Sequence, residues 1–332
     1  MIYDQSDTLK YLHQSMQKAP MVLFLGSGVM HDITDTWQDL LIELIGKALI
    51  YRFGNYFDSD FLEQITADIV HQYSTYDQAN LVKHLLKERY MLFVRGEIYK
   101  NYPDFENADS DIRNKNKIFM KVCELCLKEW VIAVVNYNYD DLIETCINKI
   151  SENRNVRGKS SDQKSVRKAV SQVGRLLYNP YGNQFLPIYH VHGLLPHENR
   201  SQLKEEDGFV LSRDEYFESM TDAYSWQTTT QLHFLRNNTC LFVGASLEDW
   251  NMLRIINLAC KYTKSTNIFS ILAEESFTAE NKQERDFLVH MKADILIENG
   301  INPIIVPKFD DIPKLLQEDI IDQIDHGRNK YV

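Results

Sequence analysis

The sequence lacks the features that mark membrane and secreted proteins. No apolar run among its 332 residues approaches the ~18 residues of a membrane-spanning helix, and residues 1–5 lack the basic stretch that opens a secretory leader. Its five cysteines are an odd number, which argues against a disulfide framework. Asp and Glu outnumber Lys and Arg, and the formal net charge is −11, so direct sequence-specific nucleic-acid binding is not expected. We therefore expect a cytoplasmic protein that does not bind membranes.

Short apolar runs, separated by longer helix-patterned segments, make up most of the chain. Runs of this kind, rich in β-branched residues, are typical of buried parallel strands. The pattern predicts an α/β fold, a Rossmann-like parallel sheet with helices on both faces. The expected strands are residues 21–25, 130–135, 187–191, 239–244, 268–272 and 303–306.

We expect residues 1–332 to form one catalytic domain. A helix-patterned stretch of the chain, about 51–116, separates the first two expected strands, so the parallel crossover between them contains a helical insertion. The Rossmann-like core then comprises residues 20–50 and 117–310. The final segment, 311–332, is expected to add a C-terminal helix.

A basic segment at 151–169 interrupts the otherwise acidic chain. One interpretation is a solvated loop, and the other is a docking surface for an acidic partner or a phosphate. The solvated loop is the interpretation that composition favours. Its basic residues are Arg154, Arg157, Lys159, Lys164, Arg167 and Lys168.

A glycine turn, Gly26-Ser27-Gly28, follows the first expected strand. Glycines at such a point let the backbone turn tightly and approach a ligand, and the next helix directs its N–H groups at a phosphate. The third glycine of a dehydrogenase fingerprint is missing, because His31 stands in its place. An ordinary hydride-transfer dehydrogenase is therefore not expected, and taken alone the turn is more often structural.

Polar side chains end two other expected strands. Asn138 and Asp140 follow residues 130–135, and His192 follows residues 187–191. An amide beside a carboxylate suits ribose hydroxyls or a bound water, and a histidine near its ordinary pKa can accept a proton at neutral pH. Together these residues suit cleavage of an N-glycosidic bond through an oxocarbenium-like transition state.

Each of these residues also has a purely structural interpretation. Asn138 and Asp140 could cap the helix expected from residue 142, since Asn and Asp are preferred N-cap residues. His190 and His192 share one face of their strand and, with His197, could bind a metal, although no carboxylate or cysteine stands at a familiar ligand spacing. His190 is better interpreted as a packed or hydrogen-bonded residue.

These stretches, in this order, resemble the sirtuin family, and most closely its bacterial sirtuin-like branch. The segment 209–216 also resembles that branch, and the resemblance spans about residues 20–307. The motifs that carry it are Gly26-Ser27-Gly28-Val29, Tyr137-Asn138-Tyr139-Asp140, His192-Gly193 and Gly244-Ala245-Ser246-Leu247.

The resemblance implies that the sheet binds NAD. Asn138 and His192 would be the catalytic residues, with His192 acting as general base or orienting the ribose. Trp37 and Leu40 match an apolar stretch after the glycine turn, for which core packing is expected. The implied NAD-binding residues are Gly26, Ser27, Gly28, Val29, Asn138, Asp140, Gly244 and Ser246.

Departures from the family pattern indicate a subclass. Protein deacylases of the family carry a four-cysteine zinc module after the His-Gly motif, whereas residues 194–207 contain no cysteine. Cys123 and Cys126 lie before the Asn motif without a second pair, so we interpret them as core and expect no zinc. Met30 replaces a usually small residue. Without a platform for an acyl-lysine peptide, water is the expected acceptor.

The resemblance thus predicts an NAD hydrolase that releases nicotinamide and ADP-ribose. The resemblance implies an NAD-depleting effector of bacterial anti-phage defence, and uncontrolled NAD hydrolysis by such an effector would harm the host. Control by homo-oligomerisation or by a separately encoded protein such as an ATPase is therefore expected. The alternatives are a non-catalytic subunit that binds NAD or ADP-ribose within a larger complex, and an NAD-dependent protein deacylase.

Overall fold

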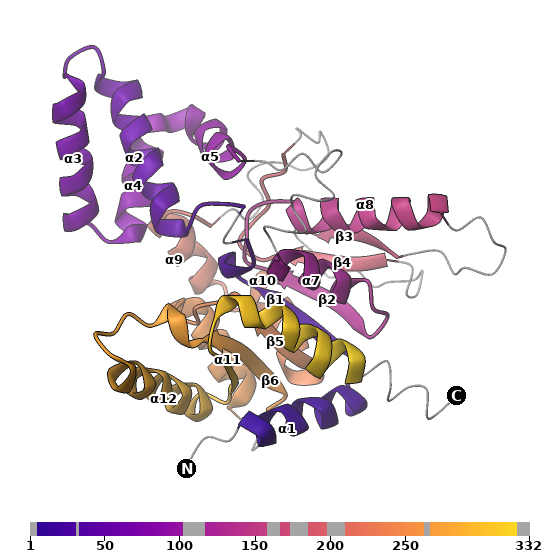
Figure 1. Ribbon diagram of the computed structural model, residues 1–332. Helices are drawn as coiled ribbons and strands as arrows, with labels where there is room; N and C mark the ends of the chain where they lie inside the picture. Colours follow the sequence, from indigo (N-terminus) through magenta and orange to yellow (C-terminus); the bar gives the residue numbers. More distant parts are fainter. Residues whose placement is uncertain are drawn as a thin grey trace.

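The computed structural model describes residues 5–30, 33–101, 117–157, 167–172, 185–197, 210–261 and 266–323. Seven parallel strands form one sheet in the order β3-β4-β2-β1-β5-β6-β7, which confirms the predicted α/β fold (Figure 1). The strands are β1 (Met21–Leu25), β2 (Val131–Asn136), β3 (Lys168–Gln172), β4 (Phe185–His190), β5 (Thr239–Val243), β6 (Ile268–Ala273) and β7 (Asn302–Val306).

Strand β1 is buried on both sides because its side chains alternate between two cores. Leu23 and Leu25 pack into one core, and Val22 and Phe24 into the other. The first core is covered by α1 (Gln5–Lys18), α7 (Lys117–Cys126), α8 (Leu142–Arg157) and α13 (Ile312–Leu315). The second is covered by α10 (Trp226–Asn237), α11 (Trp250–Cys260) and α12 (Lys282–Glu298). Helices therefore lie on both faces of the sheet, as predicted.

The helical insertion stands apart from the sheet, at the upper left of Figure 1. Thr36, Asp58 and Ser74 each begin one of its helices by accepting a backbone N–H, as N-cap residues do. The first helix, predicted to belong to the core, packs against the other three. Residues 102–116, the last part of the predicted insertion, lie outside the described residues. The helices of the insertion are α2 (Trp37–Phe53), α3 (Ser59–Gln72), α4 (Thr75–Leu86) and α5 (Tyr90–Ile98).

The basic segment at 151–169 is not simply a solvated loop, and that prediction is wrong at both ends. Helix α8 continues to Arg157, and β3 begins at Lys168. The residues between them, 158–166, lie outside the described residues. Sequence periodicity missed β3 because its short KAVSQ stretch contains few apolar residues.

Arg167 is buried and binds the backbone of its neighbours. Its guanidinium donates to the carbonyl oxygens of Lys128 at 3.0 Å and Phe185 at 3.4 Å. These bonds satisfy carbonyl groups near the starts of β2 and β4, so Arg167 supports the amino-terminal ends of these two strands.

The chain ends, within the described residues, in α13 and a π-helical turn η6 (Leu316–Ile321), whose Leu316 and Ile320 are buried against α7. In the part of the chain that the structure describes, no helix is long and apolar enough to cross a membrane. The remaining short elements are η1 (Ser27–Met30), η2 (Lys87–Arg89), α9 (Arg213–Thr221), η4 (Glu274–Ser276) and η5 (Phe309–Asp311).

Candidate active site

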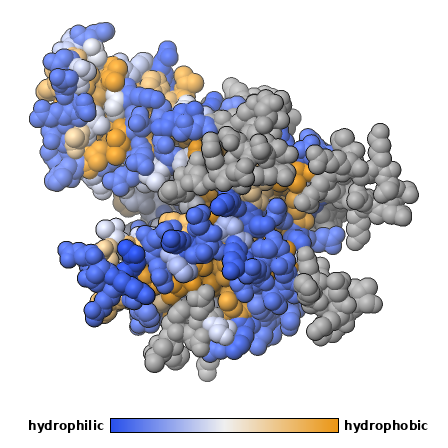
Figure 2. Space-filling model, viewed as in Figure 1, coloured by the Kyte–Doolittle hydropathy of each residue, from blue (hydrophilic) through white to orange (hydrophobic). Residues whose placement is uncertain are grey.

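A cleft of about 890 Å³ lies at the carboxyl ends of the central strands. Strand β1 sits between β2 and β5, so the chain crosses to opposite sides of β1 at the point where open α/β sheets bind ligands. A notch separates the helical insertion from the lower part of the molecule in Figure 2. Residues of α2, α4 and α5 line the cleft opposite the strand ends. The predicted site residues that line it are Gly26, Ser27, Gly28, Asn138, Asp140, His192, Gly244 and Ser246.

One residue predicted to bind NAD at the glycine turn does not line the cleft. Val29 belongs to η1 and is buried in the core, with 2% of its surface exposed. Met30 is likewise fully buried, so its side chain does not line the cleft. The turn leads into the short η1, and α2 begins only at Trp37.

The three glycines pack directly against one another. Gly28 donates its N–H to the carbonyl oxygen of Gly244 at 2.9 Å. A Cβ on Gly26 would lie 2.4 Å from that same oxygen, and one on Gly244 would lie 2.4 Å from the backbone nitrogen of Val29. Gly244 also has φ +67°, which disfavours other residues. Close approach of the loops after β1 and β5 is thus one reason for glycine here.

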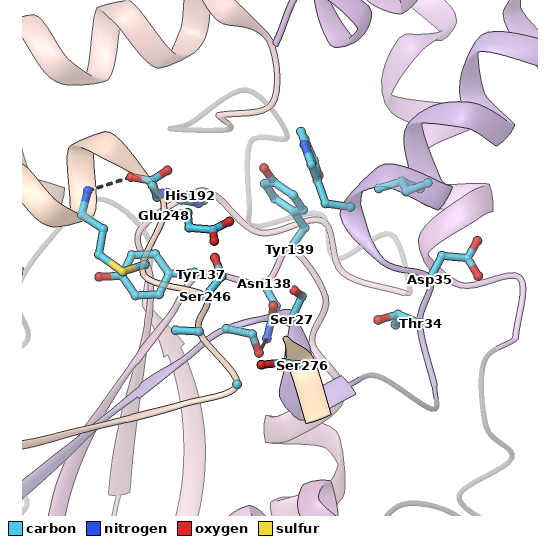
Figure 3. Close-up of a pocket in the computed structure, with 18 of the residues that line it drawn as sticks. Ser27, Thr34, Asp35, Tyr137, Asn138, Tyr139, His192, Ser246, Glu248 and Ser276 are labelled. Carbon is cyan, nitrogen blue, oxygen red and sulfur yellow. Dashed lines mark hydrogen bonds between the residues drawn. The ribbon is translucent and has the colours of Figure 1, made fainter. Parts of the chain in front are cut away.

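Asn138 is bound to the glycine turn. Its side-chain nitrogen donates to the carbonyl oxygen of Gly26 at 3.2 Å, and its backbone N–H donates to the side-chain oxygen of Asn136 at 3.1 Å. The side chain lies towards the glycine turn and Ser27 in Figure 3. The amide nitrogen of Asn138 is engaged with Gly26, whereas its Oδ1 can accept a hydrogen bond from a ligand.

Asp140 caps a helix and also lines the cleft. Its carboxylate accepts the backbone N–H of Leu142 at 3.1 Å, at the start of α8, so the capping interpretation is confirmed for this residue. Burial raises the pKa of Asp140 to about 7; the Leu142 N–H opposes this shift and the charge of Glu144 reinforces it.

His190 lies beneath the cleft, fully buried, in a hydrogen-bonded pair with Glu144. The same Glu144 oxygen accepts the hydroxyl of Ser171 at 2.6 Å. Burial opposes charge on His190, but the carboxylate outweighs it and raises the pKa of the imidazole. The interpretation of His190 as a hydrogen-bonded residue is confirmed.

His192 ends the same segment but faces the cleft. Its ring stands edge-on to Tyr137, with centroids 5.1 Å apart, and its backbone carbonyl accepts the N–H of Val210. Burial lowers the pKa of His192, an effect that Asp249 partly opposes. The imidazole is therefore neutral at pH 7 and able to accept a proton.

The loop after β5 is held by the residues that follow Ser246. Asp249 caps α11 by accepting the N–H of Met252 at 2.7 Å, and it accepts the hydroxyl of Tyr216 at 3.0 Å. Arg254, which lies one turn further along α11, donates to the side-chain oxygen of Asn251. These contacts position Ser246, which is exposed at the cleft (Figure 3).

Aromatic side chains form the far side of the cleft, a position that the sequence motifs did not predict for them. Trp37 packs against the core, as expected, and also lines the cleft, with its ring 6.0 Å from that of Tyr139. Tyr76 and Tyr216 form a second pair, at 4.6 Å. Three of these four come from the helical insertion or from α9, so only the three-dimensional packing brings them to the strand ends.

The described residues contain no group of three or more His, Cys, Asp or Glu side chains that could hold a metal ion. Cys123 and Cys126 are fully buried in the core, where they were predicted. Residues 198–209, after the His-Gly motif, lie outside the described residues.

A glycine turn after the central strand of a parallel sheet, with amide, carboxylate and imidazole groups at neighbouring strand ends, is the arrangement in which open α/β proteins bind ligands. Residues 132–296 match the family model described as the SIR2-like domain. This region contains Asn138, His192 and Ser246, and it begins after the glycine turn. The match supports the resemblance to sirtuins and an NAD-related function. No curated protein matches the chain.

Proposed function

We propose that the protein is an NAD glycohydrolase, which cleaves the bond between nicotinamide and ribose to give nicotinamide and ADP-ribose. The observation that carries the proposal is the meeting of Asn138, His192 and the glycine turn around one cleft, in a chain with a SIR2-like region. The cleft volume of about 890 Å³ is in the range that encloses small-molecule ligands.

In the proposed reaction the glycosidic bond breaks as nicotinamide leaves with the bonding electron pair and becomes neutral. A water oxygen then bonds to the anomeric carbon and loses a proton, so NAD and water yield nicotinamide, ADP-ribose and H⁺. Asn138 Oδ1 accepts a hydrogen bond from the water or a ribose hydroxyl, and neutral His192 accepts the proton. Asp140, once ionised, accepts hydrogen bonds from the ribose hydroxyls.

The test is to mix pure protein with NAD and to measure nicotinamide release. Asn138→Ala and His192→Ala should each reduce the rate by roughly 100-fold or more, because each removes a group that acts in the transition state. His233→Ala is a matched control, since His233 lies on α10 and does not line the cleft. Full activity in both site variants would contradict the proposal.

Two alternatives give different results in the same experiment. A protein that binds ADP-ribose by calorimetry but releases no nicotinamide, at any concentration or with proteins encoded beside its gene, would be a binding subunit. NAD-dependent release of the acyl group from an acyl-lysine peptide would indicate a deacylase instead.

We further propose that the enzyme is an NAD-depleting effector of bacterial anti-phage defence and is regulated by assembly. The insertion exposes large apolar side chains, among them Tyr56, Phe57 and Phe61, which a contact with another protein would bury. The test is to measure the mass of the protein in solution, by itself and after mixing with the proteins encoded beside its gene. A monomer with full activity would contradict regulation by assembly.

A further inference from the structure

The lining of the cleft is acidic. Among the described residues that form it, Lys292 on α12 is the single lysine or arginine. A dinucleotide carries two negative charges on its pyrophosphate, and transfer of these charges from water into an acidic cleft is costly without a counter-charge. The carboxylates that line the cleft are Asp35, Glu97, Asp140, Glu248 and Asp249.

Most of these carboxylates already have strong partners. Asp35 pairs with Lys100, and Glu97 pairs with Lys47 and Lys100. Asp140 and Asp249 accept the backbone N–H groups that open α8 and α11. These four side chains therefore have structural roles that do not depend on a ligand.

The pair between Lys292 and Glu248 is different. Lys292 Nζ lies 3.8 Å from Glu248 Oε1, and the Glu248 side chain is 75% exposed. A pair at this distance with an exposed carboxylate contributes little to stability, so an anion can replace the carboxylate at low cost. Glu248 belongs to the same loop as Ser246, and both project into the cleft with His192 in Figure 3.

We propose that Lys292 binds the pyrophosphate of the dinucleotide, and that Glu248 holds the ammonium in place and gives it up when the ligand enters. This inference rests on the proposed function. The glycine turn carries no charge, and the N–H groups of Gly26 and Gly28 already donate to the carbonyl oxygens of Val243 and Gly244. Lys292 supplies the positive charge that the turn lacks. Glu248 competes with the ligand, so the two residues have opposite effects on affinity.

The experiment is calorimetric titration of the full chain with ADP-ribose at fixed ionic strength, which needs no turnover. Lys292→Met should weaken binding roughly tenfold or more, as expected for loss of one charge-assisted contact. Lys292→Arg should retain most of the affinity, and Glu248→Gln should bind roughly two- to fivefold more tightly, as expected for loss of a weak exposed pair. Lys282→Met, an exposed lysine on the same helix that does not line the cleft, should bind like the wild type.

The salt dependence gives a second measurement. The affinity of the wild type for ADP-ribose should fall more steeply with salt than that of Lys292→Met, because the variant forms one fewer ionic contact. Equal affinity and equal salt dependence in Lys292→Met would overturn the inference and leave the proposed function intact. A wild type that binds no ADP-ribose would overturn both.

Discussion

His190 Nε2 lies 2.6 Å from Glu144 Oε1, and both side chains are almost completely excluded from solvent. The other ring nitrogen of His190, Nδ1, lies 3.3 Å from the backbone carbonyl oxygen of Asn138. Both ring nitrogens therefore face acceptors, which favours a doubly protonated imidazolium beside a carboxylate. Through its contact with the Asn138 carbonyl, the pair supports the loop that carries the proposed catalytic amide.

Glu144→Gln should destabilise the fold by about 3 kcal/mol, because it leaves a buried imidazolium without its counter-charge. The free energy of unfolding in urea gives the measurement. The double variant Glu144→Gln/His190→Gln should lose less than the sum of the two single variants, since the second change removes the unpaired charge. Additive losses would contradict the pairing.

The pair should also make stability depend on pH. Burial opposes both charges, but mutual attraction raises the pKa of His190 above 6.5 and lowers that of Glu144 below 4.5. The contribution of His190 is complete below pH 6.5 and is lost as pH rises through its raised pKa. That of Glu144 is complete above pH 4.5 and is lost as pH falls through its lowered pKa. The difference in the free energy of unfolding between wild type and Glu144→Gln should therefore be largest between pH 4.5 and pH 6.5.

Asp140→Asn should make the protein more stable and less active. Folding raises the pKa of Asp140 from 3.8 to about 7, so ionisation disfavours the folded state and stability falls across that interval as pH rises. The substituted amide would remove the charge and keep an oxygen for the Leu142 N–H. The variant should be more stable than the wild type above pH 7 by up to about 4 kcal/mol.

Urea unfolding of Asp140→Asn and wild type at pH 4, 6 and 8 tests this, since their stabilities should converge at the lowest pH. A variant that is less stable than wild type at pH 8 would show that the ionised carboxylate stabilises the fold. The groups that influence this titration are Glu144, His190 and Asp141.

The buried strands could be predicted from the sequence because burial on both faces leaves a continuous apolar run. Strand β1 was predicted at the same residues that the structure assigns, Met21–Leu25. The edge strand β3 lacks such a run, because only part of its KAVSQ stretch is buried. Arg167 was likewise interpreted as solvated, because the backbone carbonyl groups that it binds lie far from it in the sequence.

The site could be predicted in part for the same reason. Asn138 and His192 follow apolar strands, and the carboxyl ends of parallel strands meet at one edge of a sheet. Tyr76 and Lys292 reach the cleft from helices, where no local pattern distinguishes them from other helix residues. Contacts between distant segments decide their positions.

Gly244→Ala should destabilise the protein by about 2 kcal/mol or more, because φ is positive there and the new Cβ would lie 2.4 Å from the backbone nitrogen of Val29. Gly96→Ala is the matched control. A Cβ on Gly96, inside α5, meets nothing within 4 Å, so this change should stabilise by about 0.5–1 kcal/mol. Thermal unfolding measures both, and equal effects would contradict the close packing of the two loops.

The pH dependence of kcat/KM for NAD should separate the titrations of Asp140 and His192, which both line the cleft. Activity should fall below about pH 7 as Asp140 becomes protonated, and again below 6.5 as His192 becomes charged, because burial lowers the pKa of that imidazole. Asp140→Asn should lose the upper limb and keep the lower one. Steady-state rates of nicotinamide release across this range give the profile, and a limb near pH 7 that persists in Asp140→Asn would assign that ionisation to another group.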